Sequence, residues 1–108
     1  MALRHFDLTL TGVAQRLSTA IPAVAGAAGP DEAYKQLIFS SAPGNAAVIY
    51  VGATSSVSST SHGFSLDPTQ ATQQPVSVGP FETGPVKLSE IWVLGTNNEI
   101  LHVLGVPF

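Results

Sequence analysis

Short segments with the period of a β-strand, separated by turn residues, recur along most of this chain. Residues 5–10 alternate between polar and apolar side chains and place Phe6, Leu8 and Leu10 on one face, which is typical of a half-buried strand. The run 46–51 is apolar, rich in β-branched residues and too short for a helix, so it predicts a central strand buried on both faces. Roughly seven or eight such strands with almost no helix predict an all-β fold, a small antiparallel β-sandwich or jelly roll.

Further strands are expected at 36–40, 86–94 and 99–106. The alternation within 86–94 slips near Glu90, which predicts a β-bulge in a long strand. Residues 95–98 have the sequence Gly-Thr-Asn-Asn, and this composition is typical of a turn. We therefore expect 86–94 and 99–106 to pair as the last hairpin of the fold.

The segment 18–33 lacks strand periodicity and is rich in Ala, Gly and Pro. It is uncharged up to Pro30, whereas a free linker usually carries more polar residues. We interpret it as an extended N-terminal loop or arm within a single β-sandwich domain that spans 1–108. The candidate partner contacts in this arm are Ile21, Pro22, Val24 and Pro30.

Charge is scarce on this chain. Charged residues make up 10% of it, against about 25% in typical domains. The net charge is −3, and no Asp, Glu, Lys or Arg occurs from Gln36 to Leu66. So few basic residues argue against nucleic-acid binding, and Pro, Gly, Ser and Thr interrupt the uncharged stretches, which argues against a membrane span. The first residues lack the apolar core of a signal peptide, so we expect the chain to be made and kept in the cytoplasm, or carried inside an assembly built there.

Because charged side chains are few, the hydroxyl side chains of Ser and Thr must cover much of the surface. The extreme case is the Ser/Thr cluster 54–61, which is also expected to hold a strand because Thr favours sheets. Two interpretations remain open: an ordinary neutral soluble domain, or a surface that faces other protein. The second interpretation predicts a symmetric homo-oligomer, with a trimer expected.

No grouping of residues points to catalysis. The chain has no cysteine, which excludes disulfides and thiolate metal ligands, and it has no Gly-x-Ser-x-Gly elbow or phosphate loop. His5 and Asp7 share a strand face, but a metal site needs three or four ligands, so we interpret them as a solvated pair. His102 alternates with apolar neighbours and is expected to be partly buried and hydrogen-bonded. We expect no enzymatic activity, no metal and no cofactor.

Four residues are expected to contribute to one sandwich core. Val48 and Tyr50 alternate on one face of the expected central strand, and Trp92 and Val103 flank the expected last hairpin. Trp92 is the only tryptophan. A different interpretation of Trp92, which the sequence leaves open, is an exposed platform for a sugar ring.

Two segments resemble small virion proteins of tailed bacteriophages. The first is Asn-Ala-Ala-Val-Ile-Tyr-Val-Gly at 45–52, followed by Val-Ser-Ser-Thr at 57–60 and Gly-Phe-Ser-Leu at 63–66. The second is Gly-Pro-Val-Lys-Leu-Ser-Glu-Ile-Trp-Val-Leu-Gly-Thr at 84–96. Among such proteins the chain looks most like a capsid cement, or decoration, protein.

This resemblance implies a small β-sandwich or jelly roll, often trimeric, that binds the major capsid protein on the outside of the shell and carries no catalytic motif. It implies a location on the capsid surface of a virion assembled in the cytoplasm of the host bacterium. Two other functions remain open. One is another virion component, such as a head–tail, baseplate or fibre-attachment module, and the other is a small carbohydrate-binding β-domain.

Overall fold

The computed structural model describes residues 3–20, 34–69, 75–80 and 86–107, and these residues are mostly β-structure. The elements, in chain order, are β1 (Arg4–Thr9), β2 (Gln15–Arg16), α1 (Leu17–Ala20), β3 (Tyr34–Ser41), β4 (Ile49–Gly52), β5 (Phe64–Leu66), β6 (Val76–Val78), the 3-10 helix η2 (Leu88–Glu90), β7 (Trp92–Leu94) and β8 (Ile100–Pro107). The expected strands 5–10, 36–40 and 99–106 are thus found with small shifts of their ends. No helix among the described residues has the length and apolar character needed to cross a membrane.

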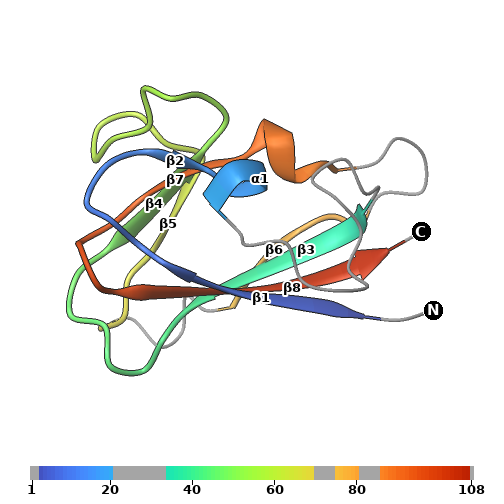
Figure 1. The fold of residues 1–108 in the computed structure, drawn as a ribbon, viewed down its shortest axis with the longest axis horizontal. Helices are drawn as coiled ribbons and strands as arrows, with labels where there is room; N and C mark the ends of the chain where they lie inside the picture. The colour runs from blue at the N-terminus through green and yellow to red at the C-terminus, as the bar shows by residue number, and fades with distance from the viewer. Residues whose placement is uncertain (1–2, 21–33, 70–74, 81–85, 108) are drawn as a thin grey trace.

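The strands form two antiparallel four-stranded sheets (Figure 1). One sheet has the order β1-β8-β3-β6 and the other has the order β2-β7-β4-β5. Strand pairing is nested along the sequence, because β1 pairs with β8, β2 with β7, β3 with β6, and β4 with β5. Two further pairings, β3 with β8 and β4 with β7, complete the sheets.

Among the strands of the described residues, β4 and β5 alone are successive strands of the same sheet. Every other pair of consecutive strands is divided between the two sheets. The expected hairpin at 95–98 is therefore wrong, since β7 and β8 belong to different sheets. The crossing is fixed by backbone hydrogen bonds from the N–H of Leu10 to the Glu99 carbonyl (2.8 Å) and from the N–H of Asn98 to the Leu10 carbonyl (2.9 Å). Asn98 adopts a left-handed backbone with φ of 70°, a conformation that Asn tolerates.

One hydrophobic core lies between the sheets. Each long strand supplies alternate residues to it, as the period of a strand requires, and residues outside the strands close its ends. The strand contributions are Phe6 and Leu8 from β1, Tyr34, Leu37 and Phe39 from β3, Ile49 and Val51 from β4, Leu66 from β5, Val93 from β7, and Leu101 and Val103 from β8. The other contributions are Leu10, Leu17, Val86, Leu88 and Ile91.

Only one of the four expected core residues belongs to this core. Val103 is 1% exposed, whereas Val48, Tyr50 and Trp92 are half-buried and lie outside the cluster of buried residues. The expected run 46–51 is also not buried on both faces, because β4 begins only at Ile49 and buries alternate residues. An apolar run gives no indication of which of its two faces points inward, and the pairing with β5 and β7 selects Ile49 and Val51.

The expected long strand over 86–94 is also wrong. Val86 makes an isolated bridge to Tyr34, the helix η2 follows, and the strand β7 has only 3 residues. Leu88 and Ile91 are both buried, and their separation of three residues matches a 3-10 turn. The slip in alternation near Glu90 therefore marks a helical turn rather than a bulge.

The expected arm is described only at its start. Ser18 and its neighbours up to Ala20 belong to α1, a single helical turn whose first residue, Leu17, is fully buried. The candidate contact residues of the arm all lie outside the described residues. They are Ile21, Pro22, Val24 and Pro30.

Candidate functional site

The outer face of the β2-β7-β4-β5 sheet carries the aromatic side chains that were expected in the core. In β4 and β7 the residues that alternate with the buried Ile49 and Val93 point outward, so Tyr50 and Trp92 lie on this face. Tyr50 is directly opposite Leu94 in the ladder, which makes Tyr50 and Trp92 diagonal neighbours on adjacent strands.

Each of these aromatic rings has one polar neighbour. The guanidinium carbon of Arg16 lies 5.0 Å from the centre of the Trp92 ring, because Arg16 in β2 is directly opposite Trp92. The imidazole of His62 lies 5.0 Å from the ring centre of Tyr50. A cation over the face of a Trp ring is attracted by the ring's quadrupole, so one face of Trp92 is already occupied.

On its other side Trp92 is opposite Gly52, where the absence of a side chain lets the following loop fold back. A Cβ at Gly52 would lie 3.0 Å from Cγ2 of Val57, and Val57 is only 5% exposed although it stands apart from the main core. The Ser/Thr cluster 54–61 therefore forms a folded loop over the end of β4. The expected strand in this cluster is absent, and the described structure there is turns with one isolated bridge between Ser58 and Ser61.

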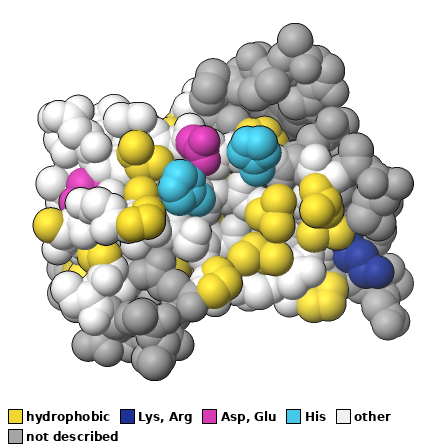
Figure 2. All heavy atoms as spheres, turned by 90° about the horizontal axis from the view of Figure 1, so that it is seen from below, with side chains coloured by type: hydrophobic (Ala, Val, Ile, Leu, Met, Phe, Trp, Pro, Cys, Tyr) yellow, Lys and Arg dark blue, Asp and Glu magenta, His cyan; other side chains and the backbone are white. Residues whose placement is uncertain are grey.

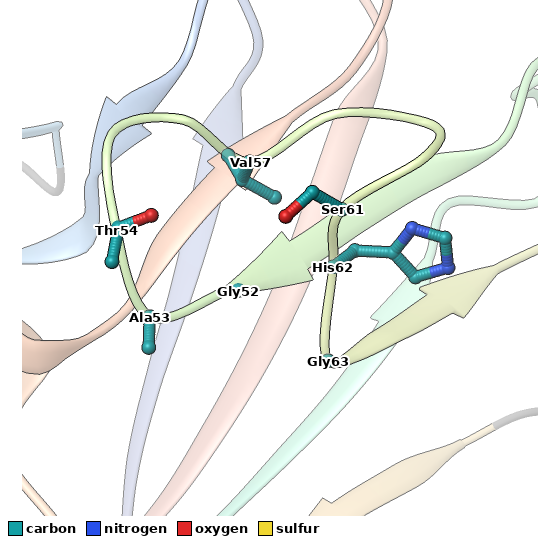
Figure 3. Close-up of a pocket in the computed structure, with 7 residues that line it drawn as sticks. All are labelled: Gly52, Ala53, Thr54, Val57, Ser61, His62 and Gly63. Atoms are coloured by element: carbon teal, nitrogen blue, oxygen red, sulfur yellow. The ribbon is translucent and has the colours of Figure 1, made fainter.

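This loop borders a small, open hollow of about 270 Å³ (Figure 3). In the close-up the hydroxyl groups of Thr54 and Ser61 point toward the interior of the loop, whereas the imidazole of His62 points away from it. A bond from the Gly63 N–H to the Val51 carbonyl (2.7 Å) closes the loop onto β4. The residues around the hollow are Gly52, Ala53, Thr54, Val57, Ser61, His62 and Gly63. The lining is small and carries no acidic, lysine or arginine side chain, so it suits a neutral, hydroxyl-bearing group.

The second exposed surface is the outer face of the β1-β8-β3-β6 sheet, which Figure 2 shows from below. Hydrophobic side chains gather there beside histidine and acidic side chains. In the ladder, Leu104 of β8 lies opposite Ile38 of β3, and Val106 lies opposite Gln36. These aliphatic residues are half-buried. Ile38 alternates with the core residues Leu37 and Phe39 along β3, and Leu104 and Val106 lie on the face of β8 opposite Leu101 and Val103.

The polar part of this face is a row across three strands. Asp7 lies directly opposite His102, and Nδ1 of His102 is 2.6 Å from Oδ1 of Asp7. The expectation of a partly buried, hydrogen-bonded His102 is confirmed, as is the exposure of His5 and Asp7. The Asp7 contact was not foreseen, since it depends on pairing between strands at opposite ends of the sequence.

Ser40 completes this row on the far side of His102. The order of serine, histidine and aspartate is that of a hydrolase triad, in which the histidine bonds both other residues. Among the described residues no hydrogen bond joins Ser40 to His102, and the hollow described above lies elsewhere, on the β4–β5 loop. Within the same residues, no group of three or more acidic and histidine side chains has the arrangement to hold a metal ion.

Comparison with known proteins does not assign a function to these surfaces. No family model, curated protein or solved structure matches the chain.

Proposed function

We propose that this chain is a structural protein of a tailed-bacteriophage virion, a cement protein that binds the outer surface of the capsid and stabilises the shell. Its partner is the major capsid protein, and its location is the capsid surface of a virion assembled in the host cytoplasm. Binding, rather than chemistry, is the function, with no cofactor. The proposal rests on the sequence resemblance together with the strand topology.

The nested strand pairing is the observation that carries the proposal. An eight-stranded antiparallel hairpin pairs its first strand with its last and its fourth with its fifth. Rolling it up adds one further pair within each of the two sheets. The pairs β1–β8, β2–β7, β3–β6 and β4–β5, with β3–β8 and β4–β7 added, follow this scheme. This pairing supports our proposal that the fold is a jelly roll, an architecture used by viral capsid proteins and by lectins.

The outer face of the β1-β8-β3-β6 sheet is the proposed capsid contact within the described residues. Its aliphatic side chains Ile38 and Leu104 are half-buried, and covering them removes apolar surface from water, at about 25 cal/mol per Å². Hydroxyl and aliphatic groups also lose less hydration energy on burial than charged groups do. The trimer expected from the resemblance adds avidity, because three linked contacts bind far more tightly than one.

Co-sedimentation with phage heads stripped of their decoration protein tests the proposal. We expect the parent chain to pellet with the heads and to raise the temperature at which they rupture. Ile38→Gln with Leu104→Gln is expected to weaken binding at least tenfold. Val13→Gln is the matched control, because Val13 is 63% exposed and lies on the β1–β2 connection, away from this face. Binding to tails or baseplates instead of heads would favour the other virion functions.

A carbohydrate-binding function is the second candidate, and the position of Trp92 favours it. Trp92 and Tyr50 share an outer face beside the hydroxyl-lined hollow, and sugar rings stack on aromatic side chains while their hydroxyls bond polar groups. A change of Trp92 fluorescence on titration with bacterial surface glycans would support this function. Trp92→Phe should then weaken binding, and Trp92→Ala should abolish it, while attachment to heads is unchanged.

A further inference from the structure

The outer edge of β1 presents backbone groups that no described residue binds. β1 is the first strand of its sheet and has β8 on one side only. Both backbone groups of Leu10 are bonded toward the β8 side, to Glu99 and Asn98. Successive residues of a strand direct their backbone groups to opposite sides. The N–H and C=O groups of His5, Asp7 and Thr9 therefore point away from β8 and toward the free edge.

Within the described residues this edge lacks most of the features that usually block strand addition, and the charges it carries are those of Arg4 and Asp7. Edge strands are commonly protected by proline, lysine, a bulge or very short length. β1 has 6 residues, includes neither proline nor lysine, and keeps a regular register with β8 from Arg4 to Thr9. The other edge of the sheet, β6, has only 3 residues. β1 is therefore the longer of the two edges of this sheet to which another strand could be added.

We propose that β1 pairs antiparallel with β1 of a second copy of this chain, about a two-fold axis that passes through Phe6. In this register His5 of each copy lies directly opposite Asp7 of the other. Both pairs consist of residues whose backbone groups point to the free edge, so each pair exchanges two backbone hydrogen bonds. The two sheets then continue into one.

The side chains of β1 select this register over its neighbours. An axis through Asp7 would place two aspartates opposite each other, and like charges in that position are destabilising. An axis through His5 would place two imidazoles opposite each other and leave Asp7 without a donor. The axis through Phe6 instead places the donor His5 opposite the acceptor Asp7 in both pairs. It also brings Leu3, a large apolar residue that is 58% exposed, opposite Thr9 of the second copy.

Asp7 can serve both contacts at once. Its Oδ1 accepts the bond from His102, and its side chain remains 59% exposed. A carboxylate has a second oxygen with free lone pairs, and an imidazole carries at least one N–H in either protonation state. His5 of the second copy can therefore donate to Oδ2 of Asp7. The row of Ser40, His102 and Asp7 would then extend across the joined sheet.

This contact is independent of the proposed function. A two-fold contact joins chains in pairs, whereas a trimer requires a different surface with three-fold symmetry. The mass of the assembly therefore separates the two, and the edge contact can be present or absent whether or not the protein binds capsids.

Sedimentation equilibrium of the purified chain tests the edge contact. We expect the parent chain to associate reversibly in multiples of two, as a dimer by the edge contact alone and as a hexamer when the trimer contact forms as well. His5→Asp places an aspartate opposite each Asp7 and is expected to weaken dimerisation at least tenfold, with an unchanged circular dichroism spectrum. His62→Asp is the matched control, because it makes the same change at an exposed histidine on the β4–β5 loop, and it should dimerise like the parent.

Mixing two variants then tests the register. Asp7→His places histidines opposite each other and is expected to prevent its own dimerisation. A mixture of His5→Asp and Asp7→His restores an aspartate opposite a histidine at both positions, so the heterodimer should form where neither homodimer does. A monomeric parent, a His5→Asp variant that dimerises like the parent, or a mixture that stays monomeric would each overturn the proposal.

Discussion

Gly105 is the position in β8 where the core leaves no room for a side chain. The residue faces inward against the fully buried ring of Tyr34, and a Cβ added there would lie 2.8 Å from Cδ1 of that ring and closer still to Cε1. Glycine inside a strand often marks such a close approach. The sequence predicted a strand here but did not show this contact, since it forms between β3 and β8.

We expect Gly105→Ala to lower the free energy of unfolding by about 1–3 kcal/mol, the usual cost of overpacking a core. Urea denaturation followed by Trp92 fluorescence measures it. Gly44→Ala is the matched control, since nothing lies within 4 Å of a Cβ at Gly44. Equal midpoints for the two variants would mean that the Tyr34 ring moves aside at no cost.

Asp67 accepts two hydrogen bonds from one residue. Its Oδ1 lies 2.7 Å from the hydroxyl oxygen of Thr69 and 2.9 Å from the Thr69 backbone nitrogen. These bonds, the hydroxyl bond first, hold the pKa of the Asp67 carboxyl below its ordinary value of 3.8. A lowered pKa means that the folded protein binds this proton less tightly than the unfolded chain does. The stabilisation is therefore present above the unfolded-state pKa and is lost as the pH falls through the folded-state pKa.

Thr69→Val is expected to raise the pKa of Asp67 toward 3.8. It removes the hydroxyl bond, which lowers the pKa more, and keeps the backbone bond, which lowers it less. An NMR titration of the side-chain carboxyl carbon measures the change. Thr69→Ser retains the hydroxyl and should leave the pKa low. A low pKa in the valine variant would show that the backbone bond alone is sufficient.

At the scale of the element, the two faces of β8 differ in how deeply they are buried. Leu101 is fully buried between the sheets, whereas Leu104 is half-buried on the outer face. We expect Leu101→Ala to lower the free energy of unfolding by about 2–5 kcal/mol, which is typical of a buried leucine. Leu104→Ala is expected to cost less than half as much. Chemical denaturation of the two variants tests this, and equal costs would contradict the assigned faces.

The clearest alternations were predicted well, because their two faces differ in polarity. β1 separates Phe6 and Leu8 from His5 and Asp7, and the structure buries the apolar pair. In β4 and β7 both faces are apolar, so the pattern did not show that Tyr50 and Trp92 point outward. Only the pairing of β4 with β7, whose paired residues lie about 40 positions apart in the sequence, decides which face points outward.

At the scale of the molecule, the fold class followed from the sequence but the connectivity did not. Turn residues such as those at 95–98 show that the chain reverses direction, and they are the same whether the next strand returns to its own sheet or crosses to the other. The crossing depends on bonds from Leu10 and on Asn45, whose side-chain amide bonds both backbone groups of Ile100 (2.7 and 3.1 Å). The Asp7–His102 contact was missed for the same reason, since 95 residues separate the pair.

The last prediction concerns the arm expected at 18–33. Its apolar residues Ile21 and Val24 follow directly on α1, whose Leu17 is anchored in the core. If the arm holds a neighbouring subunit, removing its apolar side chains should weaken attachment without affecting the β-domain. We expect Ile21→Ser with Val24→Ser to keep the parent's circular dichroism and unfolding midpoint and to reduce co-sedimentation with stripped heads at least tenfold. Val13→Ser, at an exposed position outside the arm, is the control and should bind like the parent. Full binding by the double variant would assign the contact to the sheet face of Ile38 and Leu104 alone.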